Sequence, residues 1–111
     1  IIDHAEAMAA HGADRDALTR HDIAFHQAIA KASGNVLFYN IIRSFESLMT
    51  VAVPTAWHTR NTADQRALVL EQHRRLAEAI ANRDTVAAVA EMNTHFDTSI
   101  ADLFARYSAA I

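Results

Sequence analysis

The sequence contains no cysteine, one proline and only two glycines. Without cysteine, the chain has neither disulfides nor thiolate metal ligands. So little glycine and proline leaves few residues for hairpin turns, whereas Ala, Leu, Arg, Glu and Gln, which lose least on entering a helix, are abundant. The 111 residues suffice for one hydrophobic core. We therefore predict a single all-α domain over residues 1–111, folded as an antiparallel helical bundle.

The chain also lacks a clustered basic face and a long apolar run. Ten Lys and Arg stand against 13 Asp and Glu, giving a formal net charge of −3. Because nucleic-acid binders need clustered cations, we expect no DNA binding by this segment alone. No apolar run is long enough to cross a bilayer, and the first residues do not form a signal peptide. A cytoplasmic protein without a membrane partner is the expectation.

Helix boundary signals divide the first third of the chain. Residues 1–11 predict a helix that begins without a capping residue, which we interpret as part of a longer element shortened here. Asp14 or Asp16 offers an N-cap for a second helix that ends at Ser33, and Gly34 is a typical C-terminal stop.

The remaining helices are predicted in the same way. The run from Val36 to Ala52 is apolar around more than half its circumference, which is typical of a central helix packed on several sides. Pro54 should end or kink it, and residues 55–61 are predicted as a connection. Thr62 and Gln65 form a capping-box pattern for a helix over residues 62–82. Asp84 can cap a last helix that continues to about residue 107.

Seven histidines are the unusual feature of the composition. Asp22 and His26 are four residues apart, so both project from the helix face that also carries Phe25. His73 and His95 lie in or beside the apolar stripes of the two last predicted helices. Three helices therefore direct ionisable side chains toward the interior. His4, His11, His21 and His58 are expected at the surface.

A buried carboxylate without a partner costs several kcal/mol or becomes neutral, so Asp22 needs a partner. A divalent cation bound by Asp22, His26, His73 and His95 would satisfy all four in the core of the bundle. Imidazole with carboxylate suits zinc first, with nickel, manganese or iron as alternatives. From the residues alone a second interpretation stays open, in which Asp22 accepts a hydrogen bond from one core histidine and the others are structural.

Three segments resemble a known family. Residues 22–35, which include Asp22, Phe25 and His26, resemble the D-x-x-F-H…A-S-G-N signature of the FCD domain. This is the C-terminal effector domain of the FadR subfamily of GntR transcription regulators. Residues 71–84 resemble its E-H-x-x-I-x-x-A-I-x-x-x-D segment, and residues 87–95 resemble A-x-x-x-M-x-x-H.

The resemblance implies a function. In metal-binding members, the residues matching Asp22, His26, His73 and His95 hold a divalent ion, so the resemblance favours the metal interpretation. It also implies a ligand-sensing homodimer attached to an N-terminal winged helix-turn-helix, which this sequence lacks, so DNA would be a partner only through that missing domain. The expected effector is a small carboxylate or hydroxy acid that fills the open positions of the ion and changes DNA affinity.

Four residues are candidates for contacting the effector: Arg43, Glu46, Met92 and Ser99. Many family members carry an arginine on the central helix near Glu46, so a replacement there implies another cation or a different effector. Two other function classes remain as alternatives. One is a small metal-dependent hydrolase with Glu46, Glu91 or Asp102 as a weak candidate base. The other is a purely structural metal-stabilised dimerisation bundle.

Overall fold

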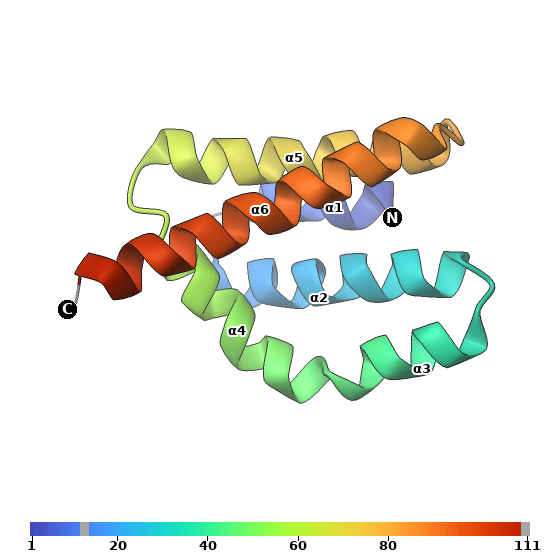
Figure 1. The fold of residues 1–111 in the computed structure, drawn as a ribbon, viewed down its shortest axis with the longest axis horizontal. Coiled ribbons are helices and arrows are strands. Elements are labelled where there is room, and N and C mark those ends of the chain that lie inside the picture. Colours follow the sequence, from blue (N-terminus) through green and yellow to red (C-terminus); the bar gives the residue numbers. More distant parts are fainter. Residues whose placement is uncertain (12–13, 110–111) are drawn as a thin grey trace. The chain divides into compact units, whose positions relative to one another are not determined.

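A computed structural model describes residues 1–11 and 14–109, and helices account for nearly all of them. In chain order these helices are α1 (Ile2–Ala10), α2 (Arg15–Ala32), α3 (Val36–Ser44), α4 (Glu46–His58), α5 (Ala63–Ala81) and α6 (Thr85–Ala109) (Figure 1). No strand occurs among the described residues. The predicted all-α class is therefore confirmed.

The described chain falls into two compact units. The first comprises Ile1 and Asp3–Pro54, and the second comprises Ile2 and the residues from Thr55 onward. In the first unit α2 and α3 lie side by side, because the tight turn at residues 33–35 reverses the chain (Figure 1). In the second unit α5 and α6 form an antiparallel pair joined by a short turn. The boundary between the units falls at Pro54, inside α4.

Local capping explains where α2 and its neighbours begin and end. Asp14 caps α2, since its Oδ1 accepts a hydrogen bond of 3.1 Å from the backbone N–H of Ala17. Gly34, with a φ of +72°, occupies the left-handed region that terminates the helix. Asn35 then caps α3 by accepting from the N–H of Phe38 at 3.0 Å. Of the two aspartates predicted as possible caps, Asp14 is the one that caps α2.

The second unit follows its sequence signals equally closely. Thr62 Oγ1 accepts from the N–H of Gln65, and Gln65 Oε1 accepts from the N–H of Thr62, both at 3.1 Å, which completes a capping box for α5. Asp84 Oδ1 accepts from the N–H of Ala87 at 3.0 Å, at the start of α6. Both predicted helices are confirmed.

The predicted central helix is wrong in two respects. Residues 36–58 form two helices, α3 and α4, which break at Phe45 and differ in direction by 63°. Pro54 lies inside α4, so the segment predicted as a connection is helical up to His58. Proline removes one helical hydrogen bond and disfavours the helix interior without excluding it, and the flanking turns of α4 persist here.

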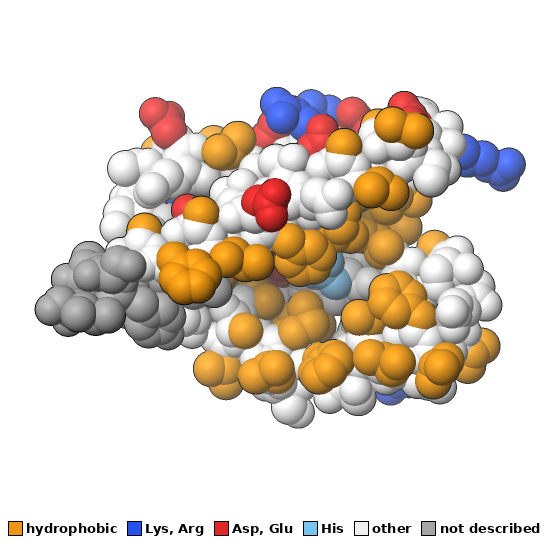
Figure 2. Space-filling model, in the orientation of Figure 1, with side chains coloured by type: hydrophobic (Ala, Val, Ile, Leu, Met, Phe, Trp, Pro, Cys, Tyr) orange, Lys and Arg blue, Asp and Glu red, His pale blue; other side chains and the backbone are white. Residues whose placement is uncertain are grey.

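The same stretch is not buried. No residue of α3 is buried, and large apolar side chains on α3 and α4 are exposed (Figure 2). The apolar pattern correctly predicted which side chains are apolar, but it does not determine whether they are buried. Burial depends on a second surface that packs against them, and the described residues supply none here. Among those residues, no single helix is long and apolar enough to cross a membrane; only the bent pair of α3 and α4 together passes that length and composition test.

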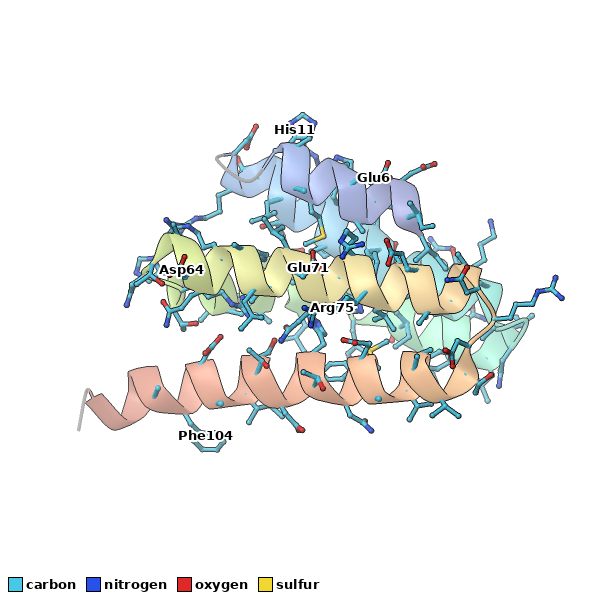
Figure 3. All side chains as sticks on the ribbon, turned by 90° about the horizontal axis from the view of Figure 1, so that it is seen from above. Glu6, His11, Asp64, Glu71, Arg75 and Phe104 are labelled. Atoms are coloured by element: carbon cyan, nitrogen blue, oxygen red, sulfur yellow. The ribbon has the colours of Figure 1, made fainter. Side chains whose placement is uncertain are left out.

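Each unit has its own buried apolar side chains. Met8 and Phe25 are fully buried in the first unit, and Leu76 is nearly so in the second. Around them the first unit buries Ala5, Ala17, Leu18, Ile23 and Ala30, and the second buries Trp57, Val69, Ala77 and Ala79. The outer face of α5 carries ion pairs among Glu71, Arg74, Arg75 and Glu78. Figure 3 shows Glu71 and Arg75 on this helix.

Candidate functional site

In the first unit, α2 holds Asp22 and His26 one turn apart. The Asp22 Oδ1 and His26 Nε2 atoms are 3.2 Å from each other, and the Asp22 residue is only 6% exposed. Phe25, fully buried, meets the His26 ring edge-on at a centroid distance of 5.4 Å. The i,i+4 spacing and this neighbour hold the imidazole beside the carboxylate. The two side chains thus present an oxygen and a nitrogen donor at one place.

In the second unit, His73 of α5 and His95 of α6 meet where the two helices pack. Their rings are perpendicular, with centroids 4.5 Å apart, and candidate ligand nitrogens of the two lie within 4.8 Å of each other. Both residues are buried. The packing of α5 against α6 thus brings candidate ligand nitrogens of two imidazoles to one place.

A backbone carbonyl sets the tautomer of His73. The Nδ1 atom lies 2.8 Å from the carbonyl oxygen of Val69. Because a carbonyl can only accept, Nδ1 carries the hydrogen and Nε2 keeps its lone pair if the ring is neutral. Metal-binding histidines commonly have this arrangement, in which the second ring nitrogen is held by a hydrogen bond. The donor chemistry of His73 therefore fits a metal ligand.

Two of the proposed effector residues flank His95 on α6. Met92 lies one turn before His95 and Ser99 one turn after it, and both are partly buried. Ser99 Oγ accepts a hydrogen bond of 3.2 Å from Arg60 Nη2. Since that contact uses an oxygen lone pair, the hydroxyl hydrogen of Ser99 remains able to donate.

The other two effector candidates, Arg43 and Glu46, are exposed in the first unit. The Arg43 guanidinium lies 5.8 Å from the centre of the Tyr39 ring. Glu46 Oε1 lies 3.4 Å from Gln27 Nε2, at an open cavity of about 350 Å³ between α2 and α4. Gln27 projects about 100° away from His26 around α2, so this cavity is on a different face from the Asp22–His26 pair.

Arg60 is a buried cation that the sequence analysis missed. Its Nε lies 3.3 Å from Asp102 Oδ2, its guanidinium carbon is 4.9 Å from the centre of the Trp57 ring, and its side chain is 3% exposed. Assigning residues 55–61 to a solvated connection hid it, since an isolated arginine in a loop has no periodic signal. These contacts link the residues after α4 to α6, and the hydrogen bond from Arg60 holds the Ser99 side chain.

Comparison with known proteins gives one match. A family model described as the FCD domain matches residues 1–98, which is most of the chain. No curated protein and no solved structure matches this chain.

Proposed function

Because this chain belongs to the FCD domain family, the effector domains of GntR-type transcription regulators, we propose that it senses a small organic acid through a bound divalent metal. In this proposal the ion is held by Asp22, His26, His73 and His95. The domain acts in the cytoplasm and passes the signal to an attached winged helix-turn-helix, which reads DNA. FCD domains belong to a class of regulators that is generally not enzymatic.

The observation that carries the proposal is the tautomer of His73. A buried neutral imidazole has one donor and one acceptor, and its Nδ1–H already has the Val69 carbonyl as partner. With hydrogen on Nδ1, the unprotonated Nε2 is the ring nitrogen of ligand type, which supports His73 as a metal ligand. The neighbouring His95 ring and the Asp22–His26 pair supply the remaining donors.

The donor set selects the kind of metal. Three imidazole nitrogens and one carboxylate oxygen are borderline ligands, so we propose zinc as the resident ion and nickel, manganese or iron as alternatives. Because a single carboxylate carries one negative charge, the divalent ion and its ligands together keep a net positive charge. When bound, the ion supplies a positive centre with coordination positions that an anionic oxygen can take.

For the effector we propose a small carboxylate or hydroxy acid. Met92 and Ser99 lie one turn to either side of His95, which supports a role for both in binding the effector. In this proposal the Ser99 hydroxyl donates to a carboxylate oxygen of the effector, while its own oxygen accepts from Arg60. Arg43 and Glu46 have less weight in the proposal, because they are exposed and engage Tyr39 and Gln27. The effector regulates only if it binds one helix arrangement more tightly than another.

A titration in two stages tests this function. First, zinc is titrated into metal-free protein by calorimetry, with His73→Ala and His95→Ala as ligand variants and His58→Ala as the control. We expect tight binding that each ligand variant weakens and the control leaves unchanged. Equal affinity in all four proteins would contradict the metal site.

The second stage adds mono- and dicarboxylates and 2-hydroxy acids to the zinc-loaded protein. We expect at least one acid to bind at millimolar concentration or below, and Ser99→Ala to weaken it. If zinc binds but no acid does, the structural alternative, in which the ion only stabilises the bundle, replaces the sensor. The hydrolase alternative predicts turnover of ester, amide or phosphate substrates by the zinc-loaded protein; of its three candidate bases, Asp102 is paired with Arg60.

We further propose that the domain is a homodimer. Seven large apolar side chains of α3, α4 and the break between them are between 42% and 71% exposed: Val36, Leu37, Phe38, Ile41, Phe45, Leu48 and Val51. Contiguous apolar surface of this kind marks an interaction site. A second copy of the chain is the occupant that the family's dimerisation favours.

A further inference from the structure

Three histidines expected to be solvated and separate come together in the first unit. His4 lies on α1, His11 forms the C-terminal end of that helix, and His21 lies on α2. The His4 and His21 Nδ1 atoms are 3.4 Å apart, and their ring centroids are separated by 5.7 Å. The His11 ring stacks on that of His21, with centroids 5.9 Å apart and ring planes nearly parallel, at 9°.

The spacing along α1 explains why this helix contributes two of the three rings. His4 and His11 are seven residues apart, which is close to two full turns, so both lie on one face of the helix. That face is turned toward His21. Figure 3 shows His11 at the end of α1, with its ring directed outward. The cluster is therefore accessible from solvent, whereas the Asp22–His26 pair is mostly buried.

The distance between the two Nδ1 atoms matches shared metal ligation. With zinc–nitrogen bonds of about 2.0–2.1 Å and a tetrahedral angle, two ligand nitrogens are roughly 3.3–3.4 Å apart. Without a cation, a hydrogen bond between the two atoms requires one ring to be the Nδ1–H tautomer and the other not. With a cation, both rings adopt the same tautomer, with hydrogen on Nε2.

We propose that His4 and His21 form a second site for a divalent transition metal, bound through their Nδ1 atoms, with His11 as a third ligand after rotation of its side chain. Imidazole ligands without thiolate suit nickel, copper or zinc. The site shares no ligand with the core set. His21 is adjacent to Asp22, but successive side chains on a helix project about 100° apart.

Such a site would join α1 to α2. A metal bridging His4 and His21, which are 17 residues apart, adds a cross-link that the unfolded chain lacks. The surface site thus couples metal availability to the order of the first helix.

Zinc titration of the metal-free chain by calorimetry tests the second site. We expect two binding events in the original sequence, a tight one and a weaker one. The double variant His4→Gln/His21→Gln should lose the weaker event and keep the tight one. His11→Gln should weaken the second event, and His58→Gln, which removes a histidine from the end of α4, should leave both events unchanged.

The single variant His4→Gln should lower the zinc affinity of the second event by at least about tenfold. Even residues that only hydrogen-bond to a metal ligand contribute roughly 10- to 100-fold to metal affinity. An unchanged two-event titration in the double variant would overturn the proposal, as would the absence of a weaker event in the original sequence. Because the core ligands are untouched in these variants, failure of this site is distinguishable from failure of the sensor proposal.

Nitrogen NMR of the imidazole rings gives an independent readout that does not depend on a variant folding. Zinc added beyond the first equivalent should shift the Nδ1 resonances of His4 and His21. Shifts confined to other histidines would assign the second event elsewhere and contradict the proposal. Far-UV circular dichroism checks that each variant keeps its helix content.

Discussion

At the residue scale, the polar side chains buried in the second unit are held by specific partners. The His73 ring contacts a backbone carbonyl, and Gln72 donates to Thr98 Oγ1 at 3.1 Å. Arg60 pairs with Asp102, donates to Ser99 and lies against the Trp57 ring. Burial of such groups is tolerated only with partners of this kind. Each contact is therefore specific to the packing of α5, α6 and the end of α4.

Arg60 offers a direct test of that view. Arg60→Ala should lower the free energy of unfolding by about 2–3 kcal/mol, because it removes buried packing and leaves Asp102 without its cation. The value stays below that of a fully buried pair, since the Asp102 side chain is 25% exposed. Urea denaturation measures the loss.

The matched control is Arg43→Ala, which removes an exposed arginine of the other unit and should cost no more than about 0.5 kcal/mol. Arg60→Lys should fall between the two, since it keeps the charge and loses the planar fork. A cost for Arg60→Ala equal to that of the control would show that its contacts contribute nothing.

At the element scale, helix ends follow the sequence because each cap is a contact between residues three or fewer positions apart. Asp14, Asn35, Thr62 and Asp84 all accept hydrogen bonds from N–H groups within the first turn of their own helix. Such contacts need no distant partner. For that reason the caps at Asp14, Thr62 and Asp84 were predictable without a structure, and Asn35 follows the same rule although it was not predicted as a cap.

Gly34 provides the test at this scale. Its φ of +72° is costly for a residue with a Cβ, and nothing lies within 4 Å of where that atom would be. Gly34→Ala should therefore cost about 1–2 kcal/mol from backbone conformation alone. Thermal unfolding of the two proteins measures it.

Two related variants control for this interpretation. Gly34→Asn should cost less, because asparagine tolerates the left-handed region. Arg83 has a positive φ of 56°, so Arg83→Gly should be neutral or stabilising. Equal losses for Ala and Asn at position 34 would mean that side-chain bulk, not backbone conformation, is responsible.

At the scale of the whole molecule, the proposed core ligands are divided evenly between the units. Asp22 and His26 belong to the first and His73 and His95 to the second. A cation bound by the proposed ligands would couple metal binding to the stability of the fold. Saturating zinc at about 100 times its dissociation constant should then stabilise the fold by roughly 2.7 kcal/mol.

Calorimetric scans with and without zinc measure this effect. We expect a single, higher transition with zinc and a lower one after chelation. His95→Ala should abolish the response to zinc, and His58→Ala should preserve it. To exclude the surface site as the cause, the comparison is repeated in the His4→Gln/His21→Gln background. A zinc response that persists in His95→Ala within that background would contradict the coupling.

The exposed apolar face of α3 and α4 leads to a prediction about assembly. Leu37 and Leu48 are 70% and 63% exposed, and Figure 2 shows a row of apolar side chains along these helices. If a second copy covers it, Leu37→Glu should shift the chain from dimer to monomer in sedimentation experiments. Val86→Glu, at an 82% exposed position of α6, is the control that should leave the dimer intact. A monomeric original sequence would refute the dimer.

The sequence by itself determined the helical class, most helix ends and the inward direction of Asp22, His26, His73 and His95. All of these depend on periodicity and on contacts within one or two turns. Only the tertiary structure decided that α3 and α4 are separate and exposed, that Arg60 is buried, and that His4 meets His21. Each of these depends on which surfaces pack together, and no spacing along a single helix specifies that choice.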